Sequence, residues 1–314
     1  MKLRAYLLML FVVAVWGSTF VIVKAALADA TPAAFNLIRM VLAFVVLGVA
    51  YHREWRNIRT WQVGSGAIVG LCLAVGYQFQ TTGLARTTPS KSAFITGLLV
   101  VLVPLFSLIP GLRPPGAKSL CWNAFAGAAL AFTGIVLLTA PATLHSPTAT
   151  TRASLSGLLP DLSTMNLGDL LTFGCAVGFA FHCIALSHIS PRIRFQPLAL
   201  LQVGFCALFM ALSLPFIEHP HVTWTPRLTL ALVIAAVLAT AAAFSIQSWV
   251  QSVLPSTHTA LLLTMEPVFA WLTSFLFMGE RMGFRPASGA LLILAGIGLT
   301  ELMPQPHVPT AHEA

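Results

Sequence analysis

Long apolar stretches follow one another along the chain, separated by short polar segments. A helix needs about 20 mainly apolar residues to cross a bilayer. Ten such stretches cover residues 5–26, 33–50, 63–79, 92–109, 121–140, 170–186, 197–217, 228–249, 257–278 and 287–303. They predict an all-α integral membrane protein with ten transmembrane helices, in which the short connections make neighbouring helices run antiparallel.

The ten predicted helices divide into two sets of five. Because five is odd, the second set enters the membrane from the opposite side, which predicts two inverted five-helix repeats, as in secondary transporters. Gly17 and Phe20 of the first predicted helix recur at the same spacing as Gly178 and Phe181 of the sixth, which favours an internal duplication. We expect a first repeat (1–140), an extramembrane linker (141–167), a second repeat (168–303) and a disordered cytoplasmic tail (304–314).

Composition supports a membrane protein. The chain is 57% hydrophobic and 8% charged, with a mean hydropathy of +0.87, whereas a soluble domain carries about 25% charged residues. The first apolar stretch exceeds the roughly 7 to 15 apolar residues of a signal peptide, so we expect it to remain in the mature protein. The net charge is +8, but the basic residues are scattered among the connections, so no nucleic-acid partner is expected.

Basic residues mark one side of the predicted membrane protein. They precede the first predicted helix and lie in the connections after the second, fourth and sixth: Lys2, Arg4, Arg53, Arg56, Arg59, Arg113, Lys118, Arg192 and Arg194. The positive-inside rule assigns this side to the cytoplasm. We therefore expect both termini to be cytoplasmic, in a multi-pass protein of the cell inner (plasma) membrane. Arg86, Arg152, Arg281 and Arg285 map to the opposite side, so the bias favours this orientation without deciding it.

Pro104 lies inside the fourth predicted helix and Pro267 inside the ninth. An interior proline lacks a backbone donor and leaves the carbonyl four residues earlier without its partner, so we expect helix kinks there. Corresponding interruptions in two repeats point to a central binding site. A kink that only improves packing is the other interpretation.

Three segments resemble the EamA-type transporters of the drug/metabolite transporter superfamily. They are WGSTFVIVKAAL (16–27), TTPSKSAFITGLLVVLVPLFSLI (87–109) and LLLTMEPVFAWLTSFLFMGERM (261–282), and the most specific part is Pro-Val-Phe-Ala at 267–270 with Gly-Glu-Arg at 279–281. The resemblance covers almost the whole chain. It implies ten helices in two inverted repeats and export of amino acids, metabolites or toxic compounds, commonly across a bacterial inner membrane.

Glu266 is a candidate functional residue because an ionisable group in the membrane is costly unless it is paired or faces a cavity. It lies near the middle of the ninth predicted helix, and Thr259, Ala270 and Thr273 share its face. This small, polar stripe is expected to look into the protein. The carboxylate could bind substrate or a proton, or could only form structural hydrogen bonds beside Pro267.

Arg39 is a second ionisable candidate, with Asn36 on the same face of the second predicted helix. Its guanidinium could meet an anionic substrate group or neutralise Glu266. A fixed structural ion pair, or an arginine that reaches the membrane interface, is the other interpretation.

Further candidates are polar or aromatic side chains at helical spacing. Trp16, Phe20 and Lys24 form an aromatic and cationic stripe that would suit amphipathic solutes, although such a stripe also serves helix packing. Neutral hydrogen-bonding pairs are Tyr77 with Gln80 and Gln247 with Gln251, while His182 and His258 are candidates for a proton relay or for packing.

These observations predict a secondary transporter that exports a small metabolite, amino acid or drug-like solute by alternating access, with proton coupling as an option. The sequence contains no GxxxxGK[ST] motif, so ATP is not the expected energy source. The five cysteines show no CxxC spacing, so no metal site is expected. No cofactor is expected either. An intramembrane enzyme is one alternative, but HExxH and GxSG motifs are missing. A non-transporting lipid-binding membrane protein is the other.

Rows of small residues permit close helix contacts in the fifth and tenth predicted helices. They comprise Gly127, Ala131 and Gly134 in the fifth, and Gly289 and Gly296 in the tenth. The contact could lie within one subunit or between the subunits of a homodimer, and the small-molecule substrate and the lipid bilayer are the other partners expected.

Overall fold

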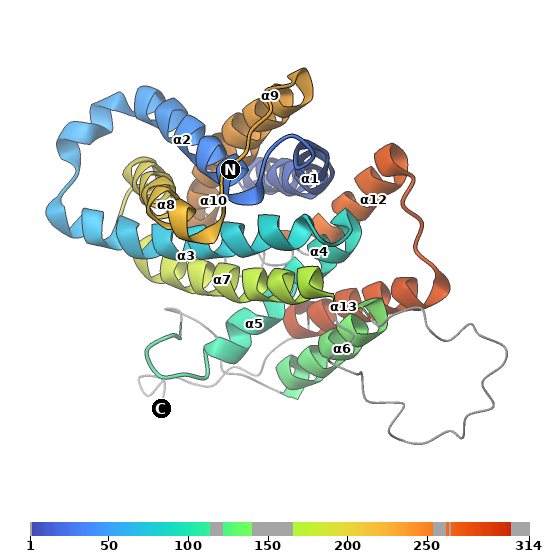
Figure 1. The fold of residues 1–314 in the computed structure, drawn as a ribbon. Coiled ribbons are helices and arrows are strands. Elements are labelled where there is room, and N and C mark those ends of the chain that lie inside the picture. The colour runs from blue at the N-terminus through green and yellow to red at the C-terminus, as the bar shows by residue number, and fades with distance from the viewer. Residues whose placement is uncertain (1, 114–121, 140–165, 254–261, 264, 303–314) are drawn as a thin grey trace, which may run out of the picture.

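The computed structural model describes residues 2–113, 122–139, 166–253, 262–263 and 265–302. These residues form helices joined by short connections (Figure 1). In the first half the helices are α1 (Lys2–Ala26), α2 (Pro32–Ala50), the 3₁₀ helix η1 (His52–Asn57), α3 (Thr60–Leu84), α4 (Pro89–Thr96), α5 (Leu99–Phe106) and α6 (Trp122–Thr139). In the second half they are α7 (Leu167–Ile189), α8 (Phe195–Ile217), α9 (Pro226–Val233), the π-helix η4 (Ile234–Ala242), α10 (Ala243–Val253), α12 (Glu266–Met278) and α13 (Phe284–Leu302).

Seven helices in the described part of the chain are long and apolar enough to cross a membrane, so the chain is a multi-pass membrane protein. They span Leu3–Ala26, Pro32–Ala50, Thr60–Leu84, Pro89–Phe106, Leu167–Ile189, Phe195–Ile217 and Pro226–Val250. Three shorter apolar helices, Phe125–Leu138, Glu266–Met278 and Phe284–Leu299, overlap the three remaining predicted spans. The all-α membrane class is confirmed, whereas the count of ten spans and the inverted repeats stay predictions.

Helices of the first half pack largely against helices of the second (Figure 1). The helix α3 lies along α7 and α8, α1 lies against α12, and α2 lies against α8 and η4. These contacts bury apolar side chains from both halves in common clusters, one of which includes Met40, Leu73 and Leu200. The space between the halves is therefore bounded by helices that are far apart in sequence.

The helices α6 and α13 pack closely along their small residues, and this contact lies within one subunit. A Cβ atom on Gly289 would lie 2.6 Å from the carbonyl oxygen of Gly134, and one on Gly134 would lie 2.5 Å from that of Gly289. Only glycine permits this approach of the two backbones. The small-residue rows are thus used internally, and they give no support to a homodimer contact.

The fourth predicted span is interrupted at Gly97 and Leu98, between α4 and α5, and not at Pro104. Hydrogen bonds of the i to i+3 type replace the α-helical pattern there, from Leu98 N to Ile95 O and from Val100 N to Gly97 O. Pro104 lies inside α5, a helix of eight residues. The break lies where α12 approaches Gly97, and a kink at Pro104 itself stays a prediction.

Pro267 lies in the first turn of α12, which begins at Glu266 after a turn at Met265. Proline is well suited to this position because the first helical turn leaves its amides without intrahelical partners. Pro267 therefore marks the beginning of a helix in the structure, where the sequence predicts a kink within one. Thr259, placed on the same face by the sequence pattern, lies outside the described residues.

Candidate functional site

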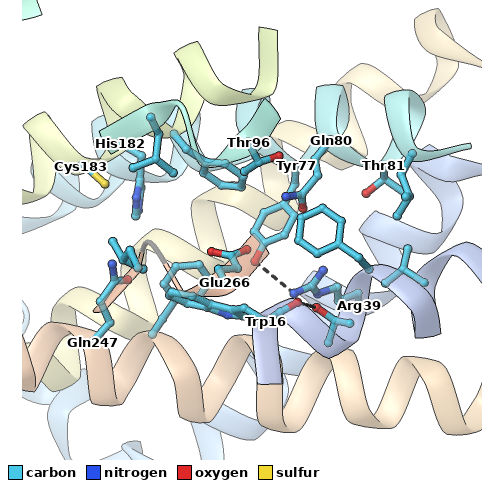
Figure 2. Close-up of a pocket in the computed structure, with 18 residues that line it drawn as sticks. Trp16, Arg39, Tyr77, Gln80, Thr81, Thr96, His182, Cys183, Gln247 and Glu266 are labelled. Atoms are coloured by element: carbon cyan, nitrogen blue, oxygen red, sulfur yellow. Dashed lines mark hydrogen bonds between the residues drawn. The ribbon is translucent and has the colours of Figure 1, made fainter. Parts of the chain in front are cut away.

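A pocket lies between the two halves of the molecule, and it encloses about 700 Å³ of non-atom space when the open solvent at its mouth is included. The first half contributes side chains from α1 to α5, and the second half contributes side chains from α7, α10 and α12 (Figure 2). Six of the nine predicted binding residues line it: Trp16, Arg39, Tyr77, Gln80, Gln247 and Glu266. The structure thus brings together residues up to 250 positions apart, counted from Trp16 to Glu266.

Arg39 is the cation of this pocket, and its side chain is almost fully buried, with 3% of the residue exposed. Its Nε donates to Thr240 Oγ1 at 2.8 Å, and its Nη2 donates to the hydroxyl of Tyr77 at 3.1 Å. The guanidinium carbon lies 4.4 Å from the centre of the Tyr77 ring, which adds a cation–π contact. Tyr77 and Thr240 therefore orient the guanidinium (Figure 2, dashed line to Tyr77).

The π-helix η4 supplies a carbonyl oxygen to two pocket residues. Ala239 O accepts from Trp16 Nε1 at 2.8 Å and from Arg39 Nη2 at 3.4 Å. The Thr240 hydroxyl donates to Ala235 O, five residues earlier, in keeping with π-helical geometry. Short π-helical segments inside α-helices are frequent at functional sites. Here the segment presents the carbonyl oxygen of Ala239 and the hydroxyl of Thr240 to side chains of α1 and α2.

Glu266 is the carboxylate of the pocket, and it is half-buried at the first residue of α12. The positive end of the α12 dipole stabilises a negative charge at this position. Within the described parts of the chain, the Glu266 side chain has neither a hydrogen bond nor an ion pair. The carboxylate is therefore available to a solute in the pocket.

Arg39 and Glu266 do not form the ion pair that was one of the sequence-based alternatives. Arg39 instead donates to Thr240, Tyr77 and Ala239, and the described residues form only three salt bridges, which lie elsewhere. The pocket thus holds a cation and a carboxylate that do not neutralise each other by direct contact.

Gln247 adds an unused acceptor to the pocket. It is 3% exposed, and its Oε1 has no hydrogen-bond partner. An unpartnered buried carbonyl oxygen is costly unless a ligand or water donates to it. Gln247 and Glu266 therefore both present free acceptors where α10 and α12 meet the pocket (Figure 2).

Three predicted binding residues lie outside the pocket lining and make structural contacts. Lys24 Nζ donates to the carbonyl oxygens of Leu84 and Ala85 at the end of α3, at 2.8 and 3.0 Å. Asn36 Nδ2 donates to Tyr77 O and Gln78 Oε1, and this contact fastens α2 to α3. Thr273 donates to Phe269 O and lies 3.3 Å from Ser18 Oγ at the contact of α12 with α1.

Several lining residues were not among the nine predicted binding residues. Phe179, His182 and Cys183 come from one face of α7, and Phe244 comes from α10, one turn before Gln247. Their spacing of three and four residues is the available signal, but the same spacing occurs throughout an apolar helix. His182, considered in the sequence as a relay or packing residue, is buried against Phe244 and lies 3.0 Å from Gln202 Oε1.

No cluster of three or more His, Cys, Asp or Glu side chains with metal-binding geometry occurs in the described ranges. What the fold and pocket define is a multi-pass membrane protein whose polar site lies between two helical halves. The family model described as the EamA-like transporter family matches residues 3–140 and again 166–302. The chain belongs to this family, and through it to the drug/metabolite transporter superfamily.

Relatives over nearly the full length carry the name of transporters. An uncharacterized transporter of Archaeoglobus fulgidus is 32% identical, covering 96% of this chain and 87% of its own. The uncharacterized transporter YoaV of Bacillus subtilis is 21% identical and covers 90% of this chain and 91% of its own. A solved crystal structure aligns with a TM-score of 0.61 and 19% identity over 95% of this chain and 96% of that chain, which supports the fold.

Proposed function

We propose that the protein is a secondary transporter that binds a small polar or amphipathic solute in the pocket between its halves and exports it by alternating access. The observation that carries this proposal is the placement of Arg39 and Glu266, two opposite charges that face one pocket without pairing. Charged groups are kept inside membrane proteins mainly where they serve a solute or ion pathway.

The chemistry of the pocket supports a solute with both polar and apolar parts. Trp16, Phe20, Phe179 and Phe244 provide aromatic surface, while the guanidinium of Arg39 and the acceptors of Gln247 and Glu266 provide opposite polarities. Such a lining, mostly apolar with a few polar groups that fix orientation, is typical of small-molecule sites.

Ten membrane-spanning helices in two inverted repeats are part of the proposal. The family model matches once in each half of the chain, and each half contains an interrupted helix, α4–α5 in the first and the beginning of α12 in the second. Broken helices at the interface of two repeats are where such transporters bind substrate. The positive-inside pattern supports cytoplasmic termini, and an inner-membrane location is part of the same proposal.

Contacts between the two halves at the helix ends away from the proposed cytoplasmic side support an alternating-access mechanism. Asp29 binds Arg227 through two hydrogen bonds of 2.8 Å, and Glu218 accepts from two amides in the first turn of α2 at 2.9 and 3.0 Å. Glu280 accepts from Ser90 at the beginning of α4. These contacts tie the ends of helices from different halves, so access from that side requires their separation.

Counterflow in proteoliposomes tests the function. Purified protein is reconstituted, vesicles are loaded with one unlabelled compound from a panel of amino acids, other metabolites and drug-like solutes, and uptake of the labelled compound is measured. Transport predicts accumulation for at least one compound and its loss when Arg39 and Glu266 are both replaced by Gln. Absence of flux for every compound would favour a lipid-binding protein, and chemical conversion of a compound would favour an intramembrane enzyme.

A further inference from the structure

A second cavity lies where α7 is joined to α8, at the end of the membrane-spanning helices. It encloses about 530 Å³ of non-atom space when the open solvent at its mouth is included. The connection and the first turn of α8 form one wall, and α10 contributes Ser248 to the other. None of its lining residues belongs to the pocket that contains Arg39 and Glu266.

The beginning of α8 is suited to an anion. Arg194 is the N-cap residue of this 23-residue helix, and its side chain makes no capping hydrogen bond with the first turn. Pro197 in the same turn lacks an N–H group, so the first-turn amides are those of Phe195 and Gln196, two residues that line the cavity. Free amides and the positive end of the helix dipole together favour phosphate and similar groups.

Ser248 provides an independent observation that points to a ligand. It is 2% exposed, it lines the cavity, and its hydroxyl has no hydrogen-bond partner. Several other helical serines donate to the carbonyl oxygen four residues earlier, as Ser245 does to Ala241 O at 2.7 Å and Ser187 does to Cys183 O at 2.8 Å. Ser248 lacks this contact, so its hydroxyl is left for an occupant of the cavity.

The remaining polar groups fit the same ligand. The Nη1 of Arg194 lies 3.2 Å from Glu54 Oε1. The N–H groups on the other two guanidinium nitrogens, Nε and Nη2, can donate to a ligand. Gln196 Oε1 is buried and unpartnered, and it can accept from a hydroxyl or ammonium group next to the anion. A phosphate beside such a donor is the chemistry of a phospholipid headgroup, and a free phosphate shares its anionic part.

We propose that this cavity, formed by the uncapped beginning of α8 together with Arg194 and Ser248, binds a phosphate group. Ser248 donates to a phosphate oxygen, Arg194 supplies the positive charge, and the amides of the first turn complete the site. Occupancy would place one ligand in contact with both the α7–α8 connection and α10.

Binding to the purified full-length protein in a phosphate-free maltoside detergent tests the proposal without a transport assay. The probes are dioleoyl phosphatidylglycerol, dioleoylglycerol as a lipid without phosphate, and inorganic phosphate against chloride at matched ionic strength. Affinity is taken from the shift of the thermal unfolding midpoint with probe concentration. Stabilisation by phosphatidylglycerol alone identifies a headgroup, and stabilisation by inorganic phosphate identifies a free anion; either supports the site.

Matched variants connect the binding to the cavity. Ser248→Ala and Arg194→Gln should each weaken the phosphate-dependent affinity about tenfold, the effect of losing a hydrogen bond to a charged group. Ser245→Ala on the same helix and Arg192→Gln in the same connection should leave it unchanged, because neither residue lines the cavity. Equal affinity in wild type and both cavity variants, or equal losses in the control variants, would overturn the proposal.

Discussion

Gly97 and Pro267 face each other where one helix of each half is interrupted. A Cβ atom on Gly97 would lie 3.1 Å from Cγ of Pro267. Their neighbours Thr96 and Glu266 both line the central pocket. The two interruptions therefore meet at the wall of the proposed solute site, and relative movement of α4 and α12 changes the shape of that wall.

Replacing Gly97 by Ala should impair transport more than it impairs folding. The added methyl group would be tighter against Pro267 than an ordinary contact, so α4 and α12 must separate by a few tenths of an ångström. Overpacking of this kind costs about 1–3 kcal/mol where neighbours cannot relax. We expect slower counterflow at an unchanged expression level. Gly64→Ala is the control, because a Cβ atom at Gly64 meets nothing within 4 Å; equal rates for the two variants would contradict the prediction.

Pro267→Ala should slow turnover, whereas Pro104→Ala should affect it less. Pro267 lies at the beginning of α12 beside Gly97, and an alanine there permits the helix to extend backward. Pro104 lies within α5 and away from the interruption. Initial rates of counterflow, normalised to reconstituted protein, compare the two. Equal slowing in both variants would contradict the prediction and show that Pro104 affects turnover as much as Pro267 does.

Much of the fold could be predicted because length and hydrophobicity identify membrane helices in a sequence. All ten predicted stretches overlap helices, although their ends differ by several residues. The position of the interruption at Gly97 and the π-helix η4 were not predicted, and both lie at contacts with the other half. Gly97 meets Pro267, and η4 presents Ala239 to Trp16.

Ionisable residues in the predicted spans are a useful sequence signal for side chains that line the pocket. Arg39 and Glu266 are rare within apolar helices, so burial cost alone makes them candidates, and both line the pocket. Lys24 has the same signal, but it lies close enough to the end of α3 to donate to free carbonyl oxygens. The sequence does not show how α1 packs against α3, so it cannot tell whether Lys24 lines the pocket or binds the end of α3.

Arg39→Lys should weaken solute binding even though the positive charge remains. The guanidinium donates to Thr240 and Tyr77 together and stacks on the Tyr77 ring, and an ammonium group cannot reproduce this geometry. We expect about a tenfold rise in the solute concentration that half-saturates counterflow, as for the loss of one hydrogen bond to a charged group. Arg192→Lys, an exposed change, is the control. A lower melting temperature with unchanged half-saturation would make Arg39 purely structural.

The contact between Asp29 and Arg227 should stabilise the fold only above strongly acidic pH. Hydrogen bonds from Arg227 and then from Thr225 lower the pKa of Asp29 from its ordinary value of about 3.9. A lowered pKa in the folded state contributes stability that is present above the unfolded pKa and is lost as the pH falls through the folded pKa.

Thermal unfolding of wild type and Asp29→Asn from pH 3 to pH 7 measures this contribution. The wild type should be the more stable protein by a constant margin above about pH 4, and the margin should shrink below it as Asp29 is protonated. Asp29 is the only residue changed, so the pH dependence of the difference reports its proton. A margin that grows on acidification would contradict the lowered pKa.

Glu266→Gln tests whether the pocket carboxylate couples proton movement to transport. The amide keeps the shape of the side chain and loses the exchangeable proton, while Glu266 has no partner among the described residues that the change would strand. We therefore expect normal expression and retained solute counterflow. Acceleration of transport by a pH gradient should disappear, because the proton site is gone.

The Glu266→Asp variant keeps a carboxylate and should retain the dependence on the pH gradient, even if its rate is lower. Proteoliposomes with and without an imposed gradient, compared for wild type and both variants, separate coupling from binding. Poor folding of Glu266→Gln, with recovery when Arg39 is also replaced by Gln, would instead indicate electrostatic dependence between the two charges. Gradient-driven transport at wild-type speed in Glu266→Gln would remove Glu266 from the coupling mechanism and leave it, with Gln247, as an acceptor for the solute alone.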